Sequence, residues 1–183
     1  MTLLDIAKSF FENKVPQDAV AVDFTMGNGY DTLFLSKLVK NGKVFSFDIQ
    51  ESAIASTRVR LLENGICNVT LIHDSHTRVK DYVSGPIYAA MFNLGYLPGG
   101  DKSIHTMTES TLEAVNAALD LLAPGGVITI SVYPGHDEGE REGCAVVKLL
   151  EEKDKREFSI LQLRMINSPT SPFILVVERN KKG

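Results

Sequence analysis

Short apolar runs alternate with amphipathic segments along most of this chain. The runs span residues 19–24, 44–49, 69–72, 87–92 and 127–132. Continuous apolar runs of this length are typical of strands that are buried on both faces of a parallel sheet. Apolar residues at helical spacing predict helices at 3–13, 32–40, 52–63, 77–83, 108–122 and 139–152. The alternation therefore predicts an α/β fold with parallel strands.

Two further apolar runs, 158–166 and 173–178, have no helical segment between them and are joined by the short link NSPTSP. A parallel crossover needs a dozen or more residues, so we expect these two strands to pair antiparallel. The whole pattern predicts a Rossmann-like class I methyltransferase fold. Its sheet is seven-stranded and mostly parallel, with one antiparallel strand and helices on both faces. We expect residues 1–183 to form a single domain and ligands to bind at the carboxyl ends of the strands.

Composition limits the partners and the compartment. The formal net charge of −4 argues against a protein that coats nucleic acid non-specifically. Cys67 and Cys144 match no metal or redox spacing, so we expect a reducing compartment and no metal site. The start MTLLDIAKSFFENK is unlike a secretory signal, and no apolar run approaches the ~20 residues that span a bilayer. We therefore expect a cytoplasmic protein with no membrane partner.

The glycine-rich turn MGNGYDT follows the first apolar run. Gly27 and Gly29 let the chain turn sharply and bring backbone N–H groups close to a ligand. Asp23 can accept hydrogen bonds from this turn or from the ammonium group of a cofactor, and Asn28 and Tyr30 project from the turn toward the ligand. Alternatively, the glycines serve only to turn the chain, as they do in many α/β proteins.

The second run ends in Phe47-Asp48-Ile49-Gln50, which places Asp48 ~20 residues after the turn, where an acid can bind two ribose hydroxyls. Alternatively, Asp48 is a surface acid that ends a strand. NAD and S-adenosylmethionine (SAM) are the competing ligands. Thr32 occupies the third glycine position of G-x-G-x-x-G, where glycine lets the helix pack close beside a pyrophosphate. SAM has no phosphates, so the sequence favours SAM, with its methionine part against Asn28 and Tyr30.

Asp74, Ser75 and His76 follow the third run. Asp74 or Ser75 can hydrogen-bond an adenine edge, and His76 can stack or bond nearby. The alternative is that Asp74 or Ser75 caps the next helix, a role that is compatible with cofactor binding.

The segment NLGYLPGGD follows the fourth run and places Asn93 at the end of a strand. Methyl transfer depends on holding the acceptor atom in line with the methyl–sulfur bond. Asn93 offers both a donor and an acceptor for fixing a substrate amine or carbonyl, and Tyr96 can stack on a base. His136, after the fifth run, titrates near neutral pH and can accept a proton. In the alternative interpretation these loops are turns without chemistry and His136 is an inert surface residue.

Six motifs together cover nearly the whole chain: VDFTMGNGYDT, FDIQ, HDSH, NLGYLPGGDKSIHT, YPGHDEGEREG and NSPTSPFILVVE. In this order they resemble the small bacterial family named "putative rRNA methylase", within the class I SAM-dependent methyltransferases. The resemblance implies a homodimeric tRNA methyltransferase that N-methylates the 5-aminomethyl group of 2-thiouridine at the wobble position. By motif position it also implies that the cofactor contacts Asn28, Tyr30, Asp48, Gln50, Ser75 and His76.

Other functions stay open. A SAM-dependent methyltransferase that acts on rRNA or on a small molecule is one, and the acidic pI suits a small molecule. A non-catalytic nucleotide-binding module is another, although it has no need of an Asn-bearing loop after the fourth strand. Basic residues in the last third of the chain form either a phosphate track for RNA or a solvated face: Arg141, Lys148, Lys153, Lys155, Arg156, Arg164, Lys181 and Lys182.

Overall fold

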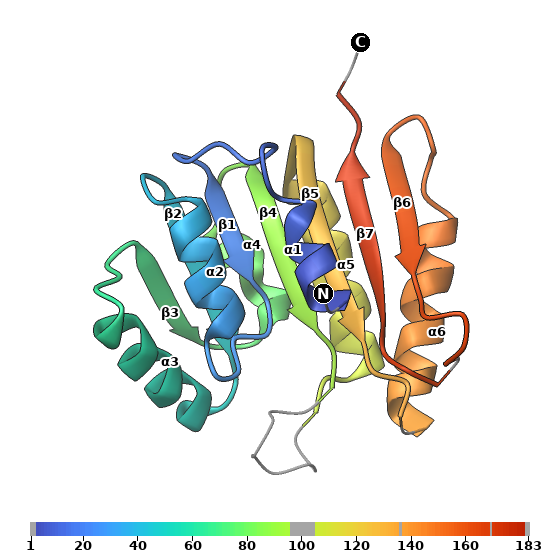
Figure 1. The fold of residues 1–183 in the computed structure, drawn as a ribbon, viewed down its shortest axis with the longest axis horizontal. Helices are drawn as coiled ribbons and strands as arrows, with labels where there is room; N and C mark the ends of the chain where they lie inside the picture. The colour runs from blue at the N-terminus through green and yellow to red at the C-terminus, as the bar shows by residue number, and fades with distance from the viewer. Residues whose placement is uncertain (1–2, 96–104, 136, 169, 182–183) are drawn as a thin grey trace.

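A computed structural model describes residues 3–95, 105–135, 137–168 and 170–181, which form one seven-stranded sheet of order β3-β2-β1-β4-β5-β7-β6 (Figure 1). The strands are β1 (Val20–Asp23), β2 (Lys43–Asp48), β3 (Val69–His73), β4 (Ile87–Asn93), β5 (Leu122–Val132), β6 (Phe158–Leu163) and β7 (Phe173–Arg179). Strands β1 to β5 pair in parallel, whereas β7 runs antiparallel to both β5 and β6. The predicted sheet is therefore confirmed, including its one antiparallel strand.

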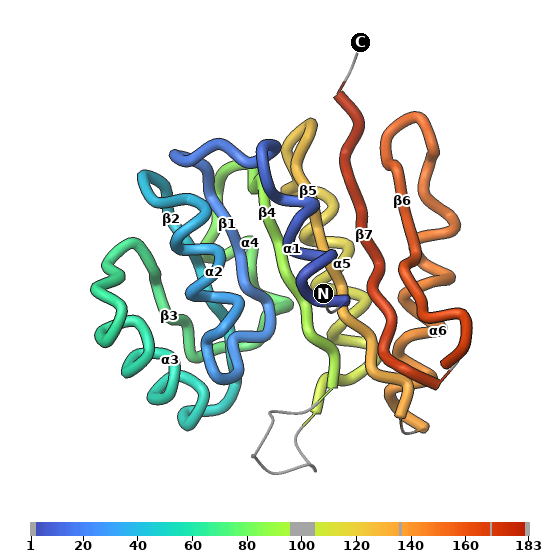
Figure 2. Tube along the Cα trace, viewed as in Figure 1, coloured from blue at the N-terminus to red at the C-terminus, as the bar shows by residue number. Residues whose placement is uncertain are grey.

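Helices cover both faces of the sheet, as predicted. The near face in Figure 1 carries α1 (Leu3–Ser9), α2 (Tyr30–Leu38) and α3 (Glu51–Glu63). The far face carries α4 (Val79–Tyr82), α5 (Thr108–Leu121) and α6 (Asp137–Glu151), and the short 3-10 helix η1 (His76–Arg78) leads into α4. The trace in Figure 2 shows α1 on the same face as α2, where α1 also contacts β7. Within the described ranges, no helix is long and apolar enough to span a membrane.

The central strands are buried on both sides because each face has its own hydrophobic core. In β1, Val22 belongs to the core under α5 and α6, and its neighbour Ala21 belongs to the core under α1 and α2. Successive side chains of a strand point to opposite faces, so an apolar strand can serve both cores. This is why the runs read as continuously apolar in the sequence.

Element ends differ from prediction by up to a few residues, and the largest differences are at the start of β5 and the end of α1. The predicted strand 127–132 belongs to a longer strand, β5, which starts at Leu122 because a register irregularity between β4 and β5 accommodates Gly125 at φ 82°. The Pro-Gly-Gly sequence that predicts the end of a helix therefore lies inside a strand. The predicted helix 3–13 ends at Ser9 and continues only as turns.

Gly42 lies between α2 and β2, tightly against the start of β1. A Cβ atom at this position would lie 1.9 Å from the carbonyl oxygen of Ala19, and both atoms belong to backbone segments held by the pairing of Val20 with Lys43. We expect Gly42→Ala to lower the free energy of unfolding by about 2 kcal/mol or more, as overpacking does. Urea unfolding followed by circular dichroism measures the change.

Gly85→Ala is the matched control, because a Cβ at Gly85 meets no atom within 4 Å. Its effect should stay within about 0.5 kcal/mol. Equal losses in the two variants would contradict the close approach at Gly42.

Candidate functional site

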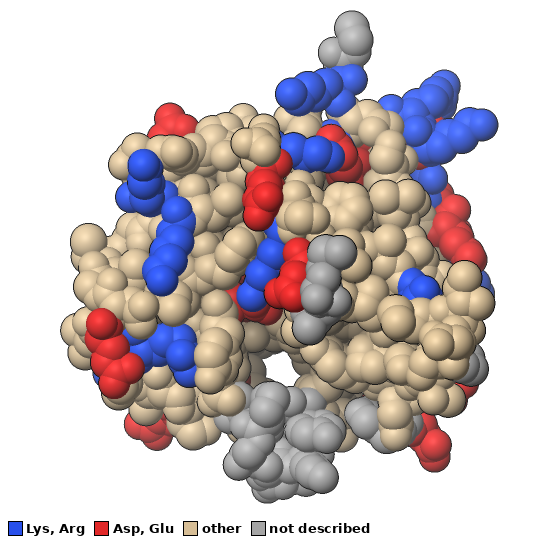
Figure 3. All heavy atoms as spheres, viewed as in Figure 1, with Lys and Arg blue, Asp and Glu red and all other residues tan. Residues whose placement is uncertain are grey.

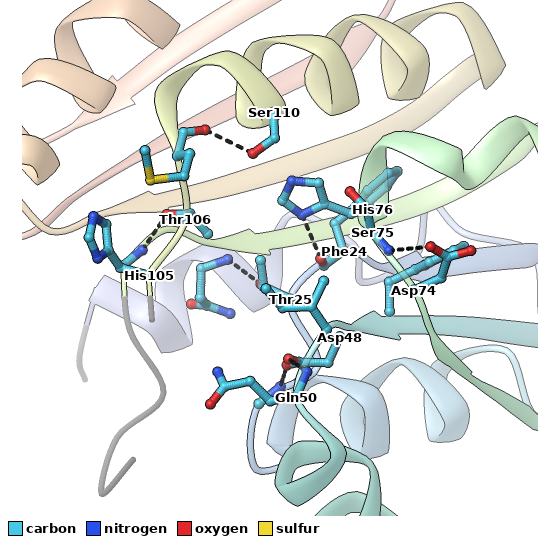
Figure 4. Close-up of a pocket in the computed structure, with 16 residues that line it drawn as sticks. Phe24, Thr25, Asp48, Gln50, Asp74, Ser75, His76, His105, Thr106 and Ser110 are labelled. Atoms are coloured by element: carbon cyan, nitrogen blue, oxygen red, sulfur yellow. Dashed lines mark hydrogen bonds between the residues drawn. The ribbon is translucent and has the colours of Figure 1, made fainter. Parts of the chain in front are cut away.

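A pocket of about 190 Å³ opens at the carboxyl edge of the sheet (Figure 4). It lies where the strand order reverses between β1 and β4, the usual position of ligand sites in open α/β sheets. The residues that line it are Phe24, Thr25, Gly27, Phe47, Asp48, Ile49, Gln50, Asp74, Ser75, His76, Asn93, Gly95, His105, Thr106, Met107 and Ser110. The structure thus brings together seven of the predicted site residues: Gly27, Asp48, Gln50, Asp74, Ser75, His76 and Asn93.

Asp48 is held by two backbone N–H groups at the end of β2. The N–H of Gly27 donates to its Oδ2 at 2.9 Å, and the N–H of Gln50 donates to its Oδ1 at 3.0 Å. Each carboxylate oxygen keeps further acceptor capacity. An acid fixed in this way at the pocket wall suits the paired hydroxyls of a ribose.

Asp23 is fully buried beneath the glycine turn. Its Oδ1 accepts from the N–H of Thr25 at 3.1 Å, and its Oδ2 accepts from the hydroxyl of Thr32 at 2.6 Å. Burial raises the pKa of Asp23 to about 7, with further contributions from the charges of Asp31 and Asp48. Of the two roles predicted for Asp23, the structure shows the bonds to the turn, and a contact with cofactor ammonium stays a prediction.

Asn28, Gly29 and Tyr30 face α3 and do not line the pocket. Gly29 has φ 78° and packs against Thr57, so the turn requires glycine there. The guanidinium of Arg60 lies 3.6 Å from the centroid of the Tyr30 ring, and its Nε donates to the carbonyl of Asn28 at 2.7 Å. These contacts tie the turn to α3, and the predicted cofactor contacts of the three residues stay predictions.

The residues that follow β3 form one wall of the pocket and cap the helix η1. Ser75 caps η1, because its Oγ accepts from the N–H of Thr77 at 3.3 Å, which confirms the capping interpretation. Asp74 accepts hydrogen bonds from Tyr82, Ser75 and Arg78, and the bond from Tyr82 contributes most to lowering its pKa.

The Nδ1 of His76 lies 3.1 Å from the carbonyl of Phe24, so this nitrogen carries a proton. Burial lowers the pKa of His76 and favours the neutral imidazole.

Asn93 reaches the pocket from the end of β4. Its backbone N–H donates to the hydroxyl of Thr25 at 2.7 Å, and its side-chain Nδ2 donates to Asp31 Oδ2 at 2.6 Å. Asn93 thus lines the pocket from the end of β4, and its predicted role in binding the acceptor stays a prediction. His136 and Tyr96 lie outside the described residues.

The sequence interpretation missed several pocket residues. Ile49 is 58% exposed although it is apolar, and its place directly after the acid of β2 was an available signal. Thr106 gave no local signal, because long-range bonds place it: it exchanges hydrogen bonds with Gly95 and donates to the buried carboxylate of Glu142 at 2.8 Å. Burial raises the pKa of Glu142, whose other oxygen accepts from Thr111 at 2.6 Å.

This sheet order, the glycine turn after β1 and the acid at the end of β2 define the class I methyltransferase fold. Comparison with known proteins places the chain within that class. It belongs to the family described as "Putative rRNA methylase", whose model matches residues 44–179.

Among its relatives is the chloroplastic tRNA (mnm(5)s(2)U34)-methyltransferase of Arabidopsis thaliana, 33% identical over 184 residues that cover 93% of this chain and 67% of that protein. A solved structure from Clostridium thermocellum, of the same description as the family, has a TM-score of 0.94 and 40% identity, and the match covers 98% of both chains. SMU.1697c from Streptococcus mutans, solved in complex with SAH, has a TM-score of 0.91 and 39% identity, again with 98% of both chains covered.

The buried carboxyl of Asp23 predicts a pH dependence of stability. Its pKa is about 7 in the folded protein against an ordinary 3.8, so between these values the folded state keeps a proton that the unfolded chain releases. The stability contributed by this proton is complete below the unfolded pKa and is lost as pH rises through the folded pKa. Relative to Asp23→Asn, the wild-type free energy of unfolding should fall by up to about 1.4 kcal/mol per pH unit over this range.

Urea unfolding of both proteins at several pH values gives the difference directly, because the contributions of the other carboxylates cancel. The difference should become constant above the folded pKa. Parallel stability curves for the two proteins would show that Asp23 ionises normally.

Proposed function

We propose that this chain is a SAM-dependent methyltransferase that N-methylates the 5-aminomethyl group of 2-thiouridine at the wobble position of tRNA. The observation that carries the proposal is that one pocket contains both an acid suited to a ribose, Asp48, and an amide suited to an amine acceptor, Asn93. The SAH complex of SMU.1697c supports the cofactor, and the Arabidopsis tRNA methyltransferase supports the substrate.

The lining residues fit SAM in their chemistry. Asp48 would bind the ribose hydroxyls, the exposed side chain of Ile49 would pack on the adenine ring, and Ser75 with His76 would bond its polar edge. Gly27 and Gln50 fix Asp48 before any ligand binds, so little ordering is required on binding. When bound, SAM supplies an electrophilic methyl group on a sulfonium centre.

The residues of the chain have positioning roles in this reaction. Asn93 orients the acceptor amine, which attacks only when it is neutral, and proximity supplies most of the rate enhancement. No side chain is needed as a nucleophile, since the amine itself attacks. His136 remains our candidate for the base that takes the released proton.

Of the predicted phosphate track, Lys182 lies outside the described residues, and the other basic residues divide between two edges of the sheet. Lys153, Lys155 and Arg156 precede β6, and Lys181 follows β7, so they lie at the edge opposite the pocket, where Figure 3 shows blue side chains gathered at the upper right. Arg141, in the first half of α6, and Arg164, just after β6, lie nearer the carboxyl edge, whereas Lys148 is in the last turn of α6. Arg141 is paired with Glu109 and Glu138. We propose a homodimer, in which two copies pool these few cations along one RNA, and sedimentation measures its mass.

The ribose assignment predicts a loss of cofactor affinity in Asp48→Ala. Removing a charge-assisted hydrogen-bond acceptor should weaken SAM binding by about 1.5–3 kcal/mol. Calorimetric titration measures this loss, with Asp120→Ala as the control, because Asp120 pairs with Lys80 on the exposed surface. An unchanged dissociation constant in folded Asp48→Ala would remove Asp48 from the cofactor site.

The substrate assignment predicts a product that nucleoside mass spectrometry can identify. Incubating tRNA that carries 5-aminomethyl-2-thiouridine with the protein and SAM should yield the 5-methylaminomethyl nucleoside. Asn93→Ala should lower kcat roughly 10²-fold while SAM affinity stays nearly intact, because misplaced reactants lose the orientation contribution. Methylation of rRNA or of a small molecule, with tRNA left unchanged, would refute the tRNA assignment. Near-wild-type turnover by Asn93→Ala would show that other groups hold the acceptor.

A further inference from the structure

A chain of polar contacts runs from α1 through α2 to the pocket. The Nζ of Lys8 in α1 lies 2.8 Å from Oδ1 of Asp31, the second residue of α2. The other oxygen of Asp31 accepts from Asn93 Nδ2 at 2.6 Å. The side chains of Lys8 and Asp31 are only 27% and 14% exposed, and Asn93 lines the pocket. A charged pair is thus connected, through one amide, to the site of the proposed reaction.

The hydrogen bonds that link Lys8, Asp31 and Asn93 can run in only one donor-to-acceptor direction. The ammonium of Lys8 can only donate hydrogen bonds, and the ionised carboxylate of Asp31 can only accept them. Asn93 must therefore turn one N–H of its NH2 group toward Asp31, with its Oδ1, a hydrogen-bond acceptor, at the other end of the amide. The bond from the backbone N–H of Asn93 to Thr25 fixes the main chain from which this side chain projects.

We propose that Asp31 is a positioning residue that makes Asn93 present its oxygen to the acceptor, and that Lys8 fixes the direction of this arrangement. The inference rests on the proposed function and deepens it, because it selects the chemical class of the acceptor. An amide oxygen accepts a hydrogen bond from a neutral amine, which carries N–H donors. It repels a ligand that offers only a carbonyl oxygen at this point.

The same polarity favours the transition state. As the amine nitrogen bonds to the methyl carbon, the carbon–sulfur bond breaks, SAH leaves, and the positive charge passes from sulfur to nitrogen. The N–H groups become stronger donors, and the resulting ammonium then releases one proton. A carbonyl oxygen that is polarised by a carboxylate behind the amide binds these groups more tightly in the transition state than in the ground state.

Replacing the carboxylate of Asp31 with an amide, which can also donate hydrogen bonds, tests the inference. In Asp31→Asn the new amide has nearly the same shape, but Lys8 attracts its oxygen, so its NH2 group faces Asn93 and forces the Asn93 amide to turn over. We expect kcat for tRNA methylation to fall about 10-fold or more, with the SAM dissociation constant and the thermal midpoint nearly unchanged. Adding Lys8→Met frees the new amide to turn, so this second change should raise kcat several-fold in the Asp31→Asn background. In the wild-type background Lys8→Met should lower kcat.

A double-mutant cycle separates positioning from general support of the fold. If Asp31 acts through Asn93, the variant Asp31→Ala with Asn93→Ala should be no slower than Asn93→Ala alone, within about a factor of three. The exposed pair Lys80 and Asp120 is the matched control, whose removal should leave kcat unchanged. Additive losses of kcat, or a Lys8→Met effect of the same sign in both backgrounds, overturn the inference.

Nuclear magnetic resonance of the side-chain amides tests the contact without any RNA. The Asn93 signal, identified by its loss in Asn93→Ala, should have one strongly downfield proton in the wild type and should lose that shift in Asp31→Asn. An identical Asn93 signal in both proteins overturns the inference whatever the substrate is. If the wild type methylates no tRNA, the proposed function fails, and this measurement alone decides the role of Asp31.

Discussion

The buried carboxylate of Asp23 connects the elements on which the site depends. It accepts bonds from Thr25 in the turn and from Thr32 in α2, and the Thr32 hydroxyl also lies 2.7 Å from Ser46 of β2. One buried group therefore fixes the end of β1 relative to the turn, the following helix and the neighbouring strand. The turn positions Gly27 against Asp48, Thr25 bonds the backbone of Asn93, and α2 carries Asp31. Both halves of the site thus depend on this one carboxylate.

Burying a carboxyl group is costly unless its hydrogen bonds are satisfied, and the raised pKa of Asp23 reflects that cost. The two hydrophobic cores offset it, since the strands around Asp23 are packed on both faces. Among the described residues, no buried side-chain nitrogen or oxygen lacks a hydrogen-bond partner. Unsatisfied buried side-chain groups in the described part of the chain therefore do not account for the position of the pocket. It follows from the reversal of strand order between β1 and β4.

The sequence predicted the fold better than it predicted the site, for a physical reason. Strand runs, glycine turns and the proline-containing link act over a few residues, so the sheet and the antiparallel pairing of β6 with β7 could be inferred locally. Asp48 and Ser75, which both line the pocket, could be selected from the sequence because each stands at or just after the end of a strand. The roles of Asn28 and Tyr30 at the turn, by contrast, depend on Arg60 of α3, and the place of Thr106 depends on Glu142 of α6. Side-chain contacts between distant elements leave no local pattern.

The two halves of the site differ in how they are built. The half suited to a nucleoside is made by the ends of β2 and β3 with the turn that follows β1, and backbone N–H groups hold its acid. The half that would face the acceptor depends on side chains from β4, α2 and α1, namely Asn93, Asp31 and Lys8. Backbone groups are present at every position, whereas one substitution can alter a series of linked side chains such as Lys8, Asp31 and Asn93. The acceptor half is therefore the part in which a fold of this class can change its substrate while the nucleoside half stays the same.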